Sequence, residues 1–269
     1  MAVTNFIPQV WSKDILDALE TECKLVANCH LAYEGDVKYA GSVKILGVGE
    51  PTVGDYTGAD ISIEDMKDEG QILNIDQRKY FAFYVDDVDE AQSVPGLRQE
   101  YQRKSVHALA VTRDTFVAGL IKTGTHVTTA TALTTEDIKE AVDEAIIAAQ
   151  ERNFNEPGVI ELDPRSARLF KNQLITMSTD NPAYIKRGVI GTYDGFEVVV
   201  SNNLAKDTNH TYCCLRGKKA IAFAGQLKEV KAVEAEKRFA DIVKGLDVYG
   251  GKVIDNDRIQ VIKVPRKAA

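Results

Sequence analysis

The sequence predicts a soluble protein of the α+β class, and three observations carry that prediction. Glycines punctuate short β-type runs between residues 33 and 84, residues 95–123 have the length and periodicity of one long helix, and apolar and polar side chains alternate from residue 219 onward. With 44% hydrophobic and 27% charged residues, the 269-residue chain has an ordinary globular composition. Its length favours about two domain-sized units.

Charge and cysteine content exclude several classes of protein. The net charge of −7 disfavours broad electrostatic binding to nucleic acids or anionic membranes. No apolar run approaches the roughly 18 residues of a membrane span, and the first residues do not form a targeting signal. The four cysteines lack C-x-x-C spacing, so we expect neither a zinc ribbon nor a disulfide framework, and a reducing cytosol fits best.

The first third of the chain predicts a short helix followed by a long hairpin. Ser12 can cap a helix through residue 27, because apolar side chains recur there on one face. Two β-type runs, 43–48 and 72–84, then flank a polar segment at about 50–70. Loops of that length inside compact proteins usually have a function, so we interpret this one as a projecting tip that reaches a partner.

The longest predicted element covers residues 95–123. Pro95 suits a first helical turn and Gly124 a helix stop, which leaves about 28 residues and about 40 Å of helix. Its basic first half is expected to face outward and its second half to pack. The apolar stripe consists of Val106, Leu109, Ala110, Phe116, Val117, Leu120 and Ile121.

The second half of the chain mixes helices and strands. Thr134 and Asp137 resemble a capping box for a helix that ends near residue 152. Asp163 follows a buried-looking strand, 159–162, and can cap a further helix. Asp194-Gly195 is the strongest hairpin signal in the chain, and the alternation after residue 219 predicts strands that return to a sheet.

No set of residues predicts catalysis, a cofactor or a metal. Gly49 and Gly54 have the spacing of a phosphate loop, but Asp55-Tyr56 replace the required Lys and Ser/Thr, and the Asp55 carboxylate would repel the phosphate. Residues 255–257 lack the glycine and the glutamate of a calcium loop. The carboxylates ahead of the long helix fit the helix dipole as well as they fit acid-base chemistry; they are Asp86, Asp87, Asp89 and Glu90. The histidines are scattered, so we expect no enzyme and no cofactor.

Surface charge points instead to contacts between proteins. The predicted tip carries an acidic cluster, relieved only by Lys67, that consists of Glu64, Asp65, Asp68 and Glu69. The start of the long helix is basic through Arg98, Arg103 and Lys104. If the two sets meet between chains, the protein polymerises. The alternative is two independently solvated charged faces.

Four segments of the chain resemble major capsid proteins of tailed bacteriophages. They are the opening MAVTNFIPQVWSKDILDALE, GEPTVGDYTG (49–58), IDQRKYFAFYVDDVDEAQ (75–92) and KGLDVYGGKVI (244–254). Each segment alone is weak evidence for the resemblance. The four segments occur in the same order as in those capsid proteins, with compatible spacing, and the match spans nearly the whole chain.

The resemblance implies the Hong Kong 97-type, or Johnson, capsid fold and a subunit of an icosahedral phage head. Its parts would be an N-terminal arm and helix (1–31), an extended β-hairpin loop with its base (32–84), a peripheral domain with a spine helix (85–123), an axial domain (124–223) and C-terminal strands that return to the peripheral domain (224–269). The loop would lie across a neighbouring subunit, which would bring the acidic tip to the basic start of an adjacent spine helix.

The resemblance also implies partners. Copies of the chain would form hexamers and pentamers, assemble in the host cytoplasm, and enclose double-stranded DNA. The net charge of −7 predicts that contact with this DNA is weak and non-specific at most. Portal and decoration proteins are further candidate partners, and any scaffolding protein would be separate because the predicted arm starts at the first residue. No membrane partner is expected, and crosslinking through Lys67 is not expected either.

Two alternatives stay open from the sequence. An encapsulin-like nanocompartment shell would share the fold but carry enzyme cargo. A soluble α/β enzyme with an unrecognised site is the alternative from a different class, and a pocket with convergent polar groups would favour it.

Overall fold

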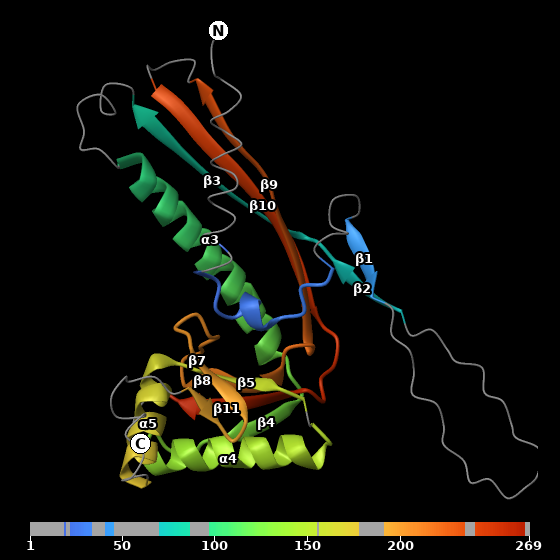
Figure 1. Cartoon of the computed structure of the whole chain (residues 1–269), viewed down its shortest axis with the longest axis vertical. Coiled ribbons are helices and arrows are strands. Elements are labelled where there is room, and N and C mark those ends of the chain that lie inside the picture. Colours follow the sequence, from blue (N-terminus) through green and yellow to red (C-terminus); the bar gives the residue numbers. More distant parts are fainter. Residues whose placement is uncertain are drawn as a thin grey trace, which may run out of the picture.

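Two sheets connected by one long helix form the body of the molecule, and a short hairpin stands out from its side (Figure 1). The computed structural model describes residues 19, 22–33, 41–45, 70–86, 97–154, 156–177, 191–234 and 240–266. The long helix, α3 (Leu97–Lys122), runs beside the smaller sheet and ends at the larger one. The expected α+β class and the expected long helix are both confirmed.

The smaller sheet has three antiparallel strands in the order β3-β10-β9. These strands are β3 (Gln77–Asp86), β10 (Ala240–Val253) and β9 (Ile221–Glu234). Aromatic side chains attach one face of this sheet to α3. Phe83 of β3 stacks on Tyr101 with 5.5 Å between ring centroids, and Phe116 meets Tyr249 of β10 edge-on at 5.3 Å.

The apolar stripe of α3 faces the core largely as expected. Five of its members are buried, whereas Phe116 and Leu120 are only half-buried. Arg113 and Asp114, which the stripe did not include, are buried as well. The middle of α3 therefore contributes buried charged side chains as well as apolar ones to the interior of the protein.

The larger sheet has six strands in the order β4-β11-β8-β5-β7-β6. The pairs β4/β11 and β5/β7 are parallel, and the other neighbours are antiparallel. The strands are β4 (His126–Thr129), β11 (Ile259–Pro265), β8 (His210–Gly217), β5 (Gly158–Leu162), β7 (Phe196–Val200) and β6 (Thr192–Tyr193). All five residues of β5 are buried, as expected for an interior strand.

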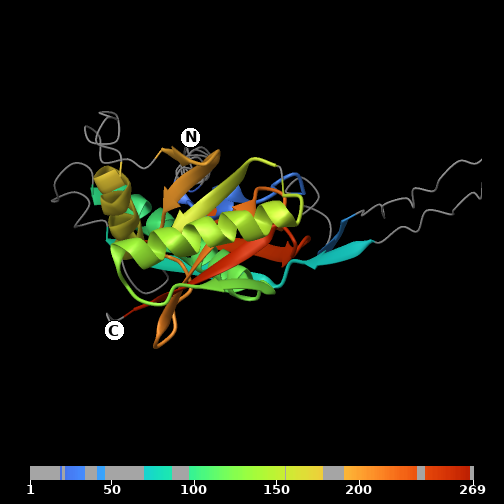
Figure 2. The same ribbon diagram turned by 90° about the horizontal axis from the view of Figure 1, so that it is seen from below.

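Two helices with the expected caps pack beside the larger sheet. Figure 2 shows α4 (Thr135–Glu151) crossing in front of it, with α5 (Pro164–Met177) at one end. The Thr134 hydroxyl accepts a hydrogen bond from the Asp137 amide at 3.1 Å. The Asp163 carboxylate accepts from the amides of Arg165 and Ser166 at 3.2 and 3.3 Å. Both predicted caps are confirmed.

The Asp194-Gly195 turn is confirmed as a tight hairpin between β6 and β7. Both residues have positive φ, 47° and 83°, which a two-residue hairpin turn of the primed type requires. Glycine adopts this conformation without strain and aspartate tolerates it better than most residues.

The predicted strand 72–84 is two strands, so that expectation was wrong in detail. β2 (Gln71–Asn74) pairs antiparallel with β1 (Ser42–Ile45) and forms the base of the hairpin. The Ile75 amide donates to the Gly41 carbonyl, which closes the hairpin at this point. β3 then pairs with β10 in the three-stranded sheet. The apolar run 72–84 is therefore divided between two sheets.

The predicted helix 12–27 does not extend to its expected end. Most of it lies outside the described residues, but the Cys23 amide still donates to the Leu19 carbonyl in the helical manner. The next three amides, of Lys24, Leu25 and Val26, donate to the Asp114 carboxylate instead. The chain then makes one 3-10 turn, η1 (Val26–Asn28), rather than another turn of α-helix.

The C-terminal strands do not all return to the same sheet. β9 and β10 lie beside α3 as expected, but β11 pairs with β8 and β4 in the six-stranded sheet. Its residues are therefore part of the unit that the sequence analysis had limited to 124–223. The expected boundary at 223/224 also falls inside β9. The remaining domain boundaries stay predictions.

Candidate subunit interface

The basic half of α3 is exposed where the structure describes it. Arg103 is 76% exposed, and its Nε lies 3.8 Å from a carboxylate oxygen of Glu100. Lys104 is also exposed, whereas the side chain of Arg98 lies outside the described residues. The acidic cluster of the tip, Glu64, Asp65, Asp68 and Glu69, lies outside them too, so the predicted contact between the two sets stays a prediction.

The hairpin base is anchored to the body by a small apolar core of its own. Val43, Ile45, Leu73 and Ile75 pack on Val248 and on alanines of β9. Gly250 makes this close approach possible, because a Cβ there would lie 2.1 Å from the Asn74 carbonyl oxygen. The described part of this region stops at residue 45 and resumes at residue 70, so this core holds the two chain segments on either side of residues 46–69.

The face of the three-stranded sheet opposite α3 carries exposed apolar side chains. Tyr80 is 80% exposed and Tyr84 58%, and Leu246 and Val233 are exposed beside them. The register places Tyr80 opposite Leu246 and Ile242 between Tyr84 and Val233. Apolar patches of this kind mark interaction surfaces. Sequence reasoning missed this face, although the alternation of Tyr80 and Tyr84 with Phe81 and Phe83 could have indicated it.

A buried ion pair connects α3 to the centre of the three-stranded sheet. Arg113 donates from Nε and Nη2 to the two carboxylate oxygens of Asp247 at 2.8 and 2.5 Å, and both side chains are almost completely buried. On the neighbouring residue, the Asp114 carboxylate accepts three amides of residues 24–26 and the Asn203 side chain. Adjacent residues of α3 therefore connect the helix to both halves of the molecule.

A second buried pair lies inside the six-stranded sheet. Arg216 of β8 donates to both carboxylate oxygens of Glu161 in β5, at 3.1 and 2.8 Å, and neither side chain is exposed. The same guanidinium donates to the carbonyls of Leu25 and Asn28, which caps the 3-10 turn. Burial alone would lower the pKa of Arg216, but the charge of Glu161 raises it well above its ordinary value. The guanidinium of Arg216 therefore stays charged, and its hydrogen bonds hold residues 25–28 against the six-stranded sheet.

The described residues hold no arrangement typical of catalysis or metal binding. Among them, no group of three or more His, Cys, Asp or Glu side chains is placed to hold a metal ion. His107 and His126 each face one carboxylate, of Glu22 and Asp257. Segment 255–257, which lacks the glycine and glutamate of a calcium loop, is a turn in which the Asp255 carboxylate accepts a hydrogen bond from the Asp257 amide. Within the described part of the chain, no helix is both long and apolar enough to cross a bilayer.

Comparison with known proteins decides between the alternatives. A family model described as phage capsid protein matches residues 69–264, well over half of the chain. The chain belongs to the phage capsid protein family. A search of curated proteins finds no match.

Solved structures give the same result. A chain from Mycobacterium phage Che8 is 28% identical, with a TM-score of 0.76 over 89% of this chain and 90% of that one. The capsid of cyanophage P-SCSP1u has a TM-score of 0.64 at 19% identity, with 84% of each chain covered. A virus-like particle from Pyrococcus furiosus covers 96% of this chain and 99% of its own at 12% identity and a TM-score of 0.62, which shows a shared fold alone.

These findings confirm a phage major capsid protein with the Hong Kong 97-type fold. The assignment of α3 as the spine helix and of the β1–β2 hairpin as the base of the extended loop stays a prediction. A capsid protein is a structural component of a virion, so the alternative of a soluble enzyme is set aside. The encapsulin-like alternative has no support from the family model.

Proposed function

We propose that copies of this chain assemble into the hexamers and pentamers of a closed icosahedral phage head. The single observation that carries the proposal is the match of nearly the whole chain, at a TM-score of 0.76, to a phage chain of the same fold. The exposed apolar face of the three-stranded sheet supports it, because such a face is stabilised when another copy covers it.

The experiment is to express the full chain alone and together with any separate scaffolding protein of the same phage. Light scattering is expected to detect particles of megadalton mass in at least one of the two preparations. A stable species near the 29.6 kDa of one chain in both preparations would contradict the proposal.

The contact proposed between subunits pairs the acidic tip of one copy with the basic start of α3 in the next. Its acidic members are Glu64, Asp65, Asp68 and Glu69, and its basic members are Arg98, Arg103 and Lys104. The exposure of Arg103 and Lys104 supports the basic half of this pairing. Each exposed ion pair contributes at most about 1 kcal/mol, but a shell repeats the contact at every subunit.

We further propose that the shell encloses double-stranded DNA with weak contact only. The net charge of −7 favours a lining that does not bind a genome tightly, so binding should be non-specific and sensitive to salt. Sequence-specific binding of a DNA duplex by the free subunit at physiological salt would contradict this. Portal, decoration and separate scaffolding proteins are further proposed partners.

Assembly in the host cytoplasm is the proposed setting. The four cysteines are free and buried, and free thiols are typical of a reducing compartment.

A further inference from the structure

The outer face of α4 carries an acidic stripe with one exposed apolar side chain. Glu136, Glu140 and Glu144 follow one another at four-residue spacing, and all are exposed. Ile147 continues the stripe next to Glu144 and is 55% exposed. Like charges at this spacing repel each other, so the pattern does not stabilise the helix beyond its first turn. Within the described residues, none of the three glutamates has a salt-bridge partner.

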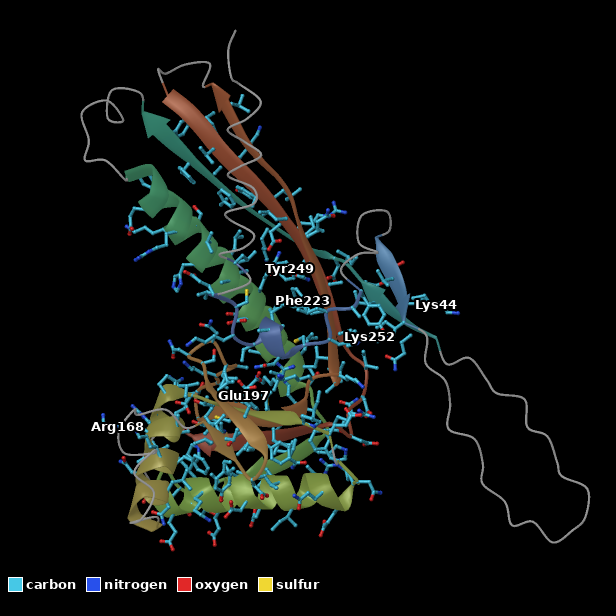
Figure 3. The ribbon with its side chains drawn as sticks, in the orientation of Figure 1. Lys44, Arg168, Glu197, Phe223, Tyr249 and Lys252 are labelled. Carbon is cyan, nitrogen blue, oxygen red and sulfur yellow. The ribbon has the colours of Figure 1, made fainter. Side chains whose placement is uncertain are left out.

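A pocket of complementary character opens between α5, β7 and residues 24–28. It has a volume of about 720 Å³, and its apolar lining includes Ala27, Ala167, Val198, Val199 and Val200. Three basic residues, Lys24, Arg168 and Lys171, also line it. Figure 3 shows Arg168 extending from α5 away from the body of the molecule.

The positive charge of this pocket is available to a partner. Among the described residues, neither Arg168 nor Lys171 has a salt-bridge partner, and the Lys24 ammonium donates only to the Val200 carbonyl, at 3.2 Å. Glu197 is the one acidic residue in the lining, and it lies 3.6 Å from the Lys218 ammonium. The pocket therefore combines an apolar floor with a basic margin.

From these two surfaces we infer a head-to-tail contact between copies of this chain. Ile147 of one copy enters the α5–β7 pocket of the next, while Glu140 and Glu144 meet Arg168 and Lys171. The two surfaces do not meet within one copy, because Ile147 is 55% exposed and, among the described residues, no salt bridge joins Glu140 or Glu144 to Arg168 or Lys171. A contact between unlike surfaces repeats from copy to copy, and it forms a ring where the rotation between successive copies closes, as the proposed hexamers and pentamers require.

The apolar and the charged side chains of this contact have different roles, as in other protein interfaces. An apolar side chain in a desolvated pocket supplies most of the binding free energy, and the surrounding charges select the partner and set the register. The inference rests on the proposed function, since it names one contact by which the subunits of a hexamer or pentamer meet. It is independent of the proposed contact at the extended loop.

Engineered disulfides test the contact directly. The double variant Ile147→Cys/Ala27→Cys, assembled and treated with the oxidant diamide, is expected to give a ladder of covalent oligomers that ends at five and six chains on a denaturing gel. The four native cysteines are buried and give little background. The matched control Val127→Cys/Ala27→Cys places its first cysteine at a residue of similar exposure (43%) on β4 and should give no ladder.

The outcomes separate this contact from the proposed function. Normal particles without a ladder would contradict the proposed contact but not the assembly of shells. A ladder that ends at two chains would also contradict it, because it indicates a symmetric contact. Failure of the unmodified chain to form particles under any condition would overturn both.

Charge exchange provides a second test. Glu140→Lys/Glu144→Lys and Arg168→Glu/Lys171→Glu should each reduce the yield of particles at least tenfold. The circular dichroism spectrum should stay unchanged, because three of the four side chains are exposed and Lys171 is only half-buried. Combining the four substitutions should restore most of the yield. If the quadruple variant still fails to form particles although both double variants fold, Glu140 and Glu144 contact a surface other than the pocket.

Discussion

Charged side chains in the interior hold together elements within each half of the molecule. Arg113 pairs with Asp247 in the smaller sheet, and Arg216 pairs with Glu161 in the larger one. Loss of one partner from such a pair typically costs about 3–5 kcal/mol, because the other charge is left buried without compensation. A few residues therefore strongly specify how α3 sits on the smaller sheet and how β5 and β8 are paired in the larger one.

Asp114 is the residue on which the entry of the N-terminal segment depends most. Asp114→Ala would leave the amides of Lys24, Leu25 and Val26 without their acceptor. We expect a loss of about 3 kcal/mol in the free energy of unfolding by urea, and new tryptic cleavage after Lys24. Thr115→Ala is the control on the exposed side of α3. An unchanged unfolding free energy for Asp114→Ala would show that the carboxylate does not hold the segment.

The thiols should be unreactive in the folded subunit. Burial raises the pKa of Cys23 and of Cys213 to about 12, and Cys29 and Cys214 are buried as well. Ellman's reagent at pH 8 should therefore label none of the four before denaturation and all four after it, because the thiolate is the reactive form. Rapid labelling of the native protein would contradict the burial.

The same pKa shifts make stability depend on pH in the alkaline range. A thiol whose pKa is raised on folding stabilises the folded state fully below its ordinary pKa of 9.0, and this contribution is lost as the pH rises toward about 12. The free energy of unfolding should accordingly fall between pH 9 and 12.

Part of the residue-level detail could be predicted from the sequence. The caps at Thr134 and Asp163 and the turn at Asp194-Gly195 depend on a few neighbouring residues, so local patterns were sufficient. The buried charges depend on partners far along the chain; Glu161 and Arg216, for example, are on different strands. A charge inside an apolar run, such as Glu161 in VIEL, was the signal available, but it does not reveal the partner.

At the scale of elements, the hairpin base depends on a glycine in β10. Gly250→Ala would place a Cβ 2.1 Å from the Asn74 carbonyl oxygen, and neither backbone can give way without loss of pairing. We expect a lower melting temperature and a failure of assembly. The matched control is Gly119→Ala on α3, where a Cβ meets nothing within 4 Å and helix propensity improves by up to about 1 kcal/mol.

If Gly250→Ala melts and assembles like the unmodified protein, the hairpin base does not pack on β10 as described. The melting temperature and the particle yield together decide this, since Gly119→Ala should leave both unchanged or raise the first.

Pairing between elements was harder to foresee than the elements themselves. The run 72–84 was correctly predicted as β structure, but its division between two sheets depends on β1 and β10, which are distant in sequence. β11 joined the larger sheet for the same reason, because its partners β4 and β8 come from another part of the chain. Periodicity indicates that a strand has a buried face and does not indicate which strand lies beside it.

At the scale of the whole molecule, the prediction of function depended on the resemblance to capsid proteins. The pattern of charged residues added only candidate contacts between subunits. The acidic tip came from charge pattern alone and lies outside the described residues. The exposed sheet face and the α5–β7 pocket became visible only once strands and helices from separate parts of the chain were brought together. A surface is a property of the folded chain, so one sequence read alone defines it poorly.

Charge reversal tests the proposed contact at the extended loop. Reversal of the acidic set, Glu64, Asp65, Asp68 and Glu69, to Lys should prevent assembly while the subunit stays folded. Reversal of Arg98, Arg103 and Lys104 to Glu in the same chain should partly restore particles, as measured by sedimentation velocity. Normal assembly of the acidic reversal at low salt, where repulsion is least screened, would contradict the pairing.

Cryo-electron microscopy of the purified full chain tests the central claim most directly. The account predicts closed shells with fivefold vertices, in which the long axis of each subunit, α3 beside the three-stranded sheet, lies within the wall. A preparation that contains only single chains, or only open filaments, would contradict it.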